Sequence, residues 1–364
     1  MNARVKRIFE NLEDNVDLIV LINHTDPLLD QAFFYVTGFE TGVFESSVAF
    51  LYPDGECVAL VSKLEETSAR KGNIPLEIPG SRKEYESIIE KKLKDAKKVG
   101  LHYNELNHSR FKLIEKMSPK GAEFIDCTKA INKARAIKDK DELDRIRRAC
   151  DISSSVAALI PEFLKEGVRE YEVAAEMEYR MKRMGADCLS FPTISSFGKN
   201  TAEPHYNAGG DVLKKDVFAL FDYGATYKRY VSDITRTFFF GKAKKEEREM
   251  YETVLEAQQI GFDSIDVGKD LSEPHDNVAK FIDGTRFKGR FIHGLGHGIG
   301  LSVHESFIGF LPNIEGKIEP GMVITVEPGV YIPGHGGVRI EDDILVKKNG
   351  IEVLTTADKE FMEV

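Results

Sequence analysis

The sequence predicts a two-domain protein in which a smaller α/β domain precedes a larger α+β domain. A chain of 364 residues is long for one domain. Predicted strands alternate with helices up to about residue 125, which is typical of an α/β domain. Beyond Cys188 the chain is rich in strands and glycine, which favours helices on a mostly antiparallel sheet. Long helical periodicity begins between these parts, so we expect domains at 1–127 and 128–364.

The N-terminal domain is predicted from apolar runs and from turn residues. Val16–Asn23 is an apolar run short enough for a buried strand, and Pro53-Asp54-Gly55 is a strong hairpin signal. Segments with helical periodicity and many charged residues indicate helices whose charged faces are solvated. The expected elements are the strand Val16–Asn23, the helix Asp26–Phe39, the hairpin strands Ser47–Tyr52 and Glu56–Ser62, the helix Glu84–Lys97, the strand Lys98–His102 and the helix Ser109–Met117.

The second domain is predicted in the same way. Two long amphipathic helices open it, and strands flanked by glycine and proline follow. The expected helices are Lys138–Ile160, Arg169–Met184, Lys244–Ile260 and Ser272–Phe281, and the expected strands are Phe191–Phe197, Val217–Tyr223, Tyr230–Phe240, Met322–Val326, Val338–Val346 and Ile351–Leu354.

Composition excludes several classes of function. Hydrophobic residues make up 42% of the chain and charged residues 30%, as in soluble globular proteins. A net charge of -10 argues against a nucleic-acid surface. We find no apolar run long enough to span a bilayer and expect no membrane partner. The cysteines form no CxxC pair, so we expect a reducing, cytoplasmic location.

The stretch Gly289–Glu305, GRFIHGLGHGIGLSVHE, contains three of the nine histidines. Alternate glycines would each cost about 1 kcal/mol inside a helix, so we expect an extended or looped backbone. His293 and His297 are therefore not the paired ligands of a helical HExxH motif. An imidazole on such a backbone is a candidate metal ligand or acid–base group.

Val217–Phe240 reads as a hairpin around a polar turn at Gly224–Lys228, with one acid in each apolar run. These acids are Asp222 and Asp233. A buried lone carboxylate is costly, so each must be paired, protonated or bound to a cation. One alternative is that one acid caps a turn and the other pairs with Arg236 or Arg229.

The segment Met322–Val346 repeats the arrangement, with Glu327 before a Pro-Gly turn and Glu341 on the returning strand. If the two hairpins form halves of a pseudo-symmetric sheet, their acids converge. Carboxylates with one imidazole, His297, suit Mn, Co, Fe or Zn. Four carboxylates balance two dications, and a pair of such ions can activate water and polarise a carbonyl. The expected chemistry is metal-assisted hydrolysis.

These motifs together resemble the pita-bread metallopeptidases. The resemblance is carried by Asp222-x10-Asp233, HGLGHGIGLSVHE, VEPG at Glu327 and VRIEDD at Glu341, with KARAIKDKDELDRIRRA resembling the entry helix. It covers essentially the whole chain and is strongest for the Xaa-Pro dipeptidase (prolidase) and Xaa-Pro aminopeptidase (aminopeptidase P) branch. It implies a pita-bread catalytic domain, a pseudo-symmetric antiparallel sheet with helices, after a creatinase/prolidase-type N-terminal domain.

The resemblance implies a ligand for each metal position. Asp222 would chelate one ion, Asp233 and Glu341 would bridge both, and His297 and Glu327 would complete the other. The ions would be Mn or Co, with Zn or Fe as alternatives. Glu327 would also shuttle the proton of a metal-bridging hydroxide.

The resemblance further implies roles for residues around the ions. His205 and His304 would line the pocket as catalytic and substrate-binding groups, and His293 would sit nearby in a substrate or structural role. Arg339 would orient ligands and offset carboxylate charge, and Thr235 would offer a supporting hydroxyl. Two histidines match no motif and are expected at the surface or in loops: His275 and His335.

The implied substrate is a proline-containing di- or oligopeptide, and the implied assembly is a homodimer. We expect an Xaa-Pro dipeptidase, with an Xaa-Pro aminopeptidase as the alternative. The alternative stays open because Phe307 and Ile308 stand where many prolidase-like sequences have a proline and an arginine that can bind a carboxylate. A metal-free peptide-binding pseudoenzyme and a creatinase-like amidinohydrolase are less consistent with the complete ligand set. Methionine aminopeptidases generally lack such an N-terminal domain.

Overall fold

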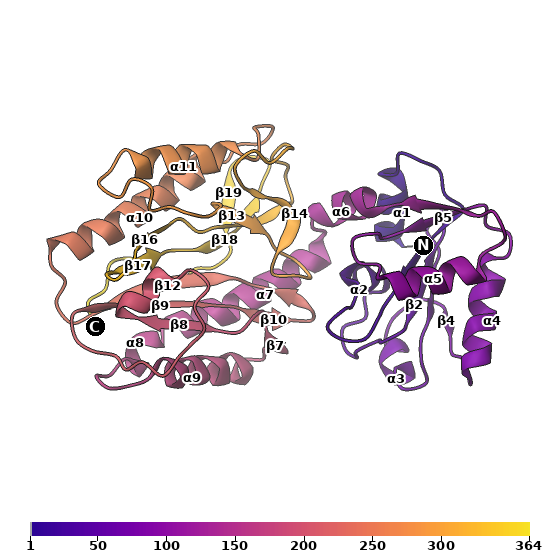
Figure 1. The fold of residues 1–364 in the computed structure, drawn as a ribbon, viewed down its shortest axis with the longest axis horizontal. Coiled ribbons are helices and arrows are strands. Elements are labelled where there is room, and N and C mark those ends of the chain that lie inside the picture. Colours follow the sequence, from indigo (N-terminus) through magenta and orange to yellow (C-terminus); the bar gives the residue numbers. More distant parts are fainter. Residues whose placement is uncertain (1) are drawn as a thin grey trace. The chain divides into compact units, whose positions relative to one another are not determined.

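The computed structural model describes residues 2–364. The chain divides after Arg135 into two compact units (Figure 1). None of the helices in the described part is long and apolar enough to cross a membrane.

The N-terminal unit is a six-stranded mixed sheet with helices, in the order β4-β3-β2-β1-β5-β6. The central strand β1 is buried along its whole length, as its unbroken apolar run predicts. The strands are β1 Leu18–Ile22, β2 Val48–Leu51, β3 Cys57–Leu60, β4 Leu76–Glu77, β5 Lys98–Leu101 and β6 Glu123–Asp126, and the helices are α1 Ala3–Glu10, α2 Gln31–Thr37, α3 Glu66–Ala69, α4 Arg82–Leu93, α5 His108–Met117 and α6 Thr128–Ala136.

Helix α2 begins later than the expected start at Asp26. Asp30 caps it, because its side chain accepts a hydrogen bond from the backbone N–H of Ala32. The helix ends at Gly38, whose φ of 69° is left-handed. The carboxylate of Asp30 also lies 3.0 Å from Nδ1 of His102, and both side chains are buried.

The larger unit contains all the remaining elements. Its helices are α7 Lys140–Ala157, α8 Ile160–Phe163, α9 Glu170–Arg183, α10 Lys245–Asp263 and α11 Glu273–Asp283, with a 3₁₀ turn, η1, at Gly198–Ala202. Its strands are β7 Cys188–Leu189, β8 Ile194–Phe197, β9 Val217–Tyr223, β10 Ala225–Tyr227, β11 Tyr230–Val231, β12 Ile234–Phe240, β13 Gly296–Gly298, β14 Glu305–Phe310, β15 Val323–Val326, β16 Gly329–Ile332, β17 Gly336–Arg339, β18 Asp342–Val346 and β19 Ile351–Val353.

The two predicted hairpins are present, and their sheets meet. The predicted turn region Gly224–Lys228 of the first hairpin is not all turn, because Ala225–Tyr227 forms β10 and pairs with β11. The sheet β12-β9-β8 contains the first hairpin, and the sheet β14-β13-β15-β18-β19 contains the second. A single antiparallel bridge between Thr235 and Glu341 joins them. The expectation of one continuous strand from Tyr230 to Phe240 is wrong, because the chain breaks before β12. The expectation of one strand from Val338 to Val346 is wrong for the same reason, because a second break separates β17 from β18. The acids Asp233 and Glu341 lie at these two breaks.

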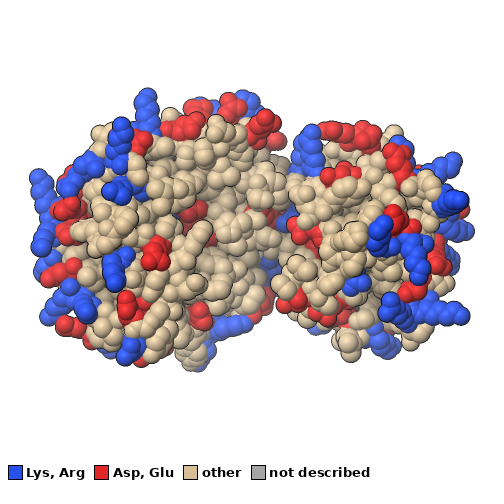
Figure 2. All heavy atoms as spheres, viewed as in Figure 1, with Lys and Arg blue, Asp and Glu red and all other residues tan. Residues whose placement is uncertain are grey.

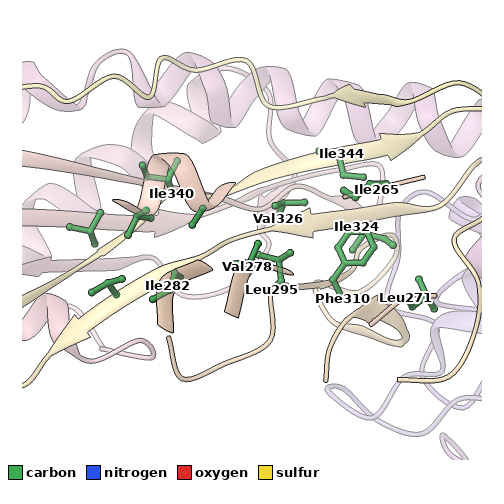
Figure 3. Packing of buried hydrophobic residues seen from close by; sticks show 14 of the residues in the cluster. Ile265, Leu271, Val278, Ile282, Leu295, Phe310, Ile324, Val326, Ile340 and Ile344 are labelled. Carbon is green, nitrogen blue, oxygen red and sulfur yellow. The ribbon is translucent and has the colours of Figure 1, made fainter. Parts of the chain in front are cut away.

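Helices cover both sides of these strands (Figure 1). One apolar cluster packs α10 and α11 against the second hairpin, and the other packs α7, α8 and α9 against the first. Figure 3 shows Val278 and Ile282 of α11 facing the strands near Leu295 and Val326. Fully burying each such side chain contributes about 1.5–3 kcal/mol. This packing holds β13, which carries His297, and the end of β15, which Glu327 follows, in fixed positions.

Charge is distributed unevenly on the surface of the larger unit. On the face seen in Figure 2, lysine and arginine side chains lie mainly around its periphery, and most of its central surface is uncharged.

Candidate metal centre

The first hairpin contributes Asp222 and Asp233. Asp222 lies on β9 opposite Thr235 of β12, and Asp233 comes directly before β12. Oδ2 of Asp222 accepts a hydrogen bond of 2.5 Å from Nη2 of Arg339. The proposed pairing of an acid with Arg236 is wrong, because Arg236 pairs with Asp342 instead. Neighbouring residues of a strand point to opposite faces, so Thr235 and Arg236 cannot both face Asp222.

The second hairpin contributes Glu327 and Glu341. Glu341 is fixed through both its backbone and its side chain by Thr235: its N–H donates to the Thr235 carbonyl at 3.2 Å, and its carboxylate accepts from the Thr235 hydroxyl at 2.6 Å. Glu327 follows β15, and its N–H donates to the carbonyl of Leu295 at 2.8 Å. Oε1 of Glu327 accepts a hydrogen bond of 3.2 Å from the hydroxyl of Thr325.

His297 lies on β13 with one ring nitrogen directed at the acids. Nδ1 is 3.3 Å from the carbonyl of Gly298, an acceptor only, so Nδ1 holds the proton in this contact. Nε2 lies 3.4 Å from Oε1 of Glu327 and 3.6 Å from Oδ2 of Asp233. The backbone must be glycine beside it, because a Cβ on Gly296 would lie 1.8 Å from the carbonyl oxygen of Thr325. The predicted extended or looped backbone of this stretch is confirmed, because β13 covers only Gly296–Gly298 and loop segments flank it.

The donor set fits divalent metal ions. Asp233, His297 and Glu341 each offer a ligand atom within 4.8 Å of the others. Oδ1 of Asp222 and Oδ1 of Asp233 are buried, and neither has a hydrogen-bond partner. Buried carboxylate oxygens without donors require a cation or a proton. The residues Asp222 and Glu327 lie outside the three-residue cluster but line the same cavity.

The electrostatics of the site lead to the same conclusion. Burial and the neighbouring carboxylates raise the pKa of Asp233 and of Glu341 well above their usual values. Burial raises the pKa of Glu327 to about 8, although Arg339 opposes the shift. Burial lowers the pKa of His297 to about 3, so the imidazole is neutral and keeps a lone pair for a metal. Dications would relieve the repulsion among the acids.

A cavity of about 750 Å³ opens above these groups. The five predicted ligands line it together with Arg339 and the predicted pocket histidines His205, His293 and His304. Thr235 lies behind the ligands and contacts Glu341. The rest of the wall includes apolar side chains: Phe191, Ile194, Ile292, Val303 and Leu311.

The three pocket histidines are held differently. His293 is the most constrained: its Nδ1 lies 2.7 Å from the carbonyl of Gly294, and its Nε2 lies 2.9 Å from the hydroxyl of Tyr331. Burial lowers the pKa of His293 to about 4. The ring of His304 lies 4.1 Å from that of His297, centroid to centroid, and burial lowers its pKa. The side chains of His205 and His304 are both exposed.

Two sequence comparisons place the chain in a family. The family described as metallopeptidase family M24 matches residues 144–348, and the creatinase/prolidase N-terminal domain matches residues 4–137. The chain belongs to metallopeptidase family M24.

Relatives and solved structures agree with this family. The M24 chain is 36% identical over 328 residues to an uncharacterized peptidase of Staphylococcus saprophyticus, covering 90% of this chain and 93% of the relative. It is similar to an Xaa-Pro dipeptidase from Bacillus anthracis, with a TM-score of 0.91, 32% identity and 99% of both chains covered. It is also similar to an X-Pro aminopeptidase from Thermotoga maritima, with a TM-score of 0.88, 28% identity and coverage of 96% and 98%. The predicted fold class is confirmed, and the protein is a prolidase-like metallopeptidase.

Sequence reasoning missed Tyr331 and misplaced one histidine of this M24 peptidase. Nη1 of Arg339 donates to the Tyr331 hydroxyl at 2.9 Å, and the hydroxyl contacts His293, so Tyr331 links the two predicted residues. Its position in an apolar strand gave no signal of this contact. His275 lies on α11 with its Nδ1 buried and its ring 5.4 Å from that of Phe291, so its expected surface or loop position is wrong. His335 occupies an exposed turn, as expected.

Proposed function

We propose that this M24 peptidase hydrolyses the Xaa-Pro bond of dipeptides with two divalent ions, Mn or Co in preference to Zn or Fe. The observation that carries the proposal is the convergence of four carboxylates and one neutral imidazole on a single cavity, with two buried carboxylate oxygens that have no donor. Such a donor set would suit hard or intermediate dications. A metal-free binding protein would have no need to bring these acids together.

The distances support a division of ligands between the two ions. Nε2 of His297 approaches both Glu327 and Asp233, so His297 and Glu327 would share one ion. Asp222 lies beside Arg339 and would hold the other. Asp233 and Glu341, which lie at the two chain breaks, would bridge the pair. Bound ions would supply Lewis-acid polarisation of the scissile carbonyl and lower the pKa of a water.

The chain's own residues would supply binding and proton transfer. The Glu327 side chain is 16% exposed, compared with 6% for Asp233, so Glu327 is better placed to move a proton between water and the leaving imino nitrogen. The exposed imidazoles of His205 and His304 would donate to the scissile carbonyl or the substrate termini. Arg339 and Thr235 would orient Asp222 and Glu341 through the hydrogen bonds described above.

An Xaa-Pro aminopeptidase is the second candidate, and one observation favours it. A dipeptidase needs a group that binds the free carboxylate near the scissile bond. Ile308 packs against β13, where a Cβ on Gly298 would lie 2.3 Å from its side chain, while Ser306 lines the cavity instead. Arg339 is engaged with Asp222, so the exposed histidines would have to hold the carboxylate of a dipeptide.

Two peptides separate these candidates. The protein is loaded with Mn or Co, freed of excess metal and incubated with Ala-Pro and Ala-Pro-Ala at equal concentration. We expect faster release of proline from Ala-Pro. Faster release of alanine from Ala-Pro-Ala would establish the aminopeptidase instead, and cleavage of neither peptide would overturn the Xaa-Pro assignment. Metal analysis of the same sample tests the two-ion stoichiometry, and light scattering tests the homodimer.

A further inference from the structure

A buried glutamate, Glu170, holds the loop that carries His205. Glu170 is fully buried in the first turn of α9. Its Oε1 accepts hydrogen bonds from the N–H of Phe197 at 2.8 Å and from Nδ2 of Asn200 at 2.9 Å. Its Oε2 accepts from the hydroxyl of Tyr206 at 2.8 Å and from the N–H of Gly209 at 3.1 Å. One carboxylate thus gathers four donors spread along residues 197–209.

Tyr206 is the partner of Glu170 that directly follows His205 in the chain. Its hydroxyl donates to Glu170 and accepts from Nδ2 of Asn200 at 2.9 Å. Burial and the hydrogen bond to Glu170 raise the pKa of Tyr206, so the phenol remains a donor. A hydrogen bond to a buried charged group is among the stronger ones in proteins.

The loop is anchored again on the other side of His205. The carbonyl oxygen of Pro204 accepts a hydrogen bond of 3.4 Å from Nη1 of Arg339. His205 therefore lies between two neighbours that are each tied to fixed groups, Pro204 to Arg339 and Tyr206 to Glu170. Its own side chain is exposed and lines the cavity. The position of His205 is therefore determined by the contacts of its two neighbours, Pro204 and Tyr206, and not by a contact of its own imidazole.

We propose that Glu170, Asn200 and Tyr206 are positioning residues that hold His205 ready to bind substrate; we name these three residues the loop lock. The role of His205 as a substrate-binding group rests on the function proposed above. An exposed imidazole on a mobile loop would have to be ordered on each binding event, and holding the loop beforehand removes that entropic cost. The loop lock therefore acts on substrate binding and leaves the metal ligands untouched.

Two adjacent glycines provide a matched pair of variants. A Cβ on Gly209 would lie 2.6 Å from the Tyr206 hydroxyl and 3.0 Å from Oε2 of Glu170, so Gly209→Ala pushes these two groups apart. A Cβ on Gly210 would meet its nearest atom, Nη1 of Arg169, at 3.8 Å, an ordinary contact. Gly210→Ala therefore adds the same methyl group at the adjacent position without a steric clash with the loop lock. Tyr206→Phe removes the hydroxyl alone.

The kinetic test is a double-mutant cycle on Ala-Pro with the Mn-loaded enzyme. Gly209→Ala and Tyr206→Phe should each raise KM about tenfold, the scale of one hydrogen bond to a buried charge, with metal content unchanged and Gly210→Ala like the wild type. In a His205→Ala background, Tyr206→Phe should have almost no further effect, because both changes remove the same interaction. Independent, multiplying effects would overturn the proposal, and so would a loss of metal in Tyr206→Phe.

Hydrogen exchange of the metal-free protein gives a second readout that needs no activity. Amides of residues 198–209 should exchange faster in Gly209→Ala and Tyr206→Phe than in Gly210→Ala and the wild type. Equal exchange in all four proteins would overturn the loop lock. A wild-type enzyme that cleaves no Xaa-Pro peptide would instead overturn the proposed function, and the exchange data would still decide whether the loop is held as described.

Discussion

Arg236 ties the Glu341 segment to the C-terminal end of the chain, and its removal gives a quantitative test of the fold around the site. The guanidinium is buried and donates to acceptors on three segments. They are the carbonyls of Thr235 at 3.0 Å, Glu341 at 2.7 Å, Ala357 at 2.8 Å and Asp358 at 3.0 Å, and Oδ1 of Asp342 at 2.7 Å. Arg236→Met keeps much of the volume and removes every donor.

The expected loss follows from the acceptors that are left behind. Asp342 keeps Lys359, Gln258 and Thr355 as donors. The carbonyls of Glu341, Ala357 and Asp358 lose the Arg236 donor, at about 1–3 kcal/mol each. Because the contacts to Ala357 and Asp358 are only partly buried, water can replace part of the lost donors and the total stays near the low end, about 3–5 kcal/mol. Such a loss should lower the melting temperature of a unit of this size by roughly 10 °C.

Thermal unfolding of the metal-free protein, followed by circular dichroism, measures this loss. Arg236→Lys is the control, because it keeps a positive charge near Asp342 while losing the planar set of donors. We expect its melting temperature to fall between those of the wild type and Arg236→Met. A wild-type melting temperature in Arg236→Met would refute this reasoning, and a lysine variant as unstable as the methionine variant would show that the charge contributes nothing.

Three further predictions follow from the site and the N-terminal unit. Asp233→Ala or Glu341→Ala should abolish metal binding and activity in a folded protein, which metal analysis and circular dichroism check; retained turnover would exclude the bridging roles. His304→Ala should lower kcat/KM about 100- to 1,000-fold with metal content unchanged, and an unchanged rate would exclude its pocket role. Burial lowers the pKa of His102, but the charge and hydrogen bond of Asp30 outweigh it, so the pKa is raised overall. The stabilisation that the His102–Asp30 pair provides is complete below about pH 6.5, and it is lost as the pH rises through the raised pKa of His102. His102→Gln should therefore lower the melting temperature more at about pH 6 than at about pH 9; an equal loss at both would contradict the assignment.

Regular elements were predictable where the apolar pattern is local. The predicted strand Val217–Tyr223 coincides with β9, and five of its seven residues are apolar. The predicted hairpin around Pro53-Asp54-Gly55 is formed by β2 and β3. In both cases a few consecutive residues are enough for the prediction: a short apolar run indicates a strand buried on both faces, and a Pro-Asp-Gly sequence indicates a tight turn.

The details of the site depend on contacts that a local pattern does not contain. Tyr230–Phe240 reads as one strand, but the chain breaks where Asp233 turns toward the second hairpin and donates its N–H to Asp343, 110 residues away, at 2.9 Å. Tyr331 follows the period of a buried strand, and only the fold shows that Arg339 and His293 meet its hydroxyl. The candidate ligands themselves were predictable because acids in apolar runs are costly and therefore stand out.

The crowding around β13 decides where this protein can be redesigned. With Gly296 pressed onto the Thr325 carbonyl and Gly298 onto Ile308, a saturation library of this strand would yield functional variants at almost no position. Selectivity for new peptides would have to be engineered instead through the wall residues Ile292, Val303 and Leu311, which line the cavity.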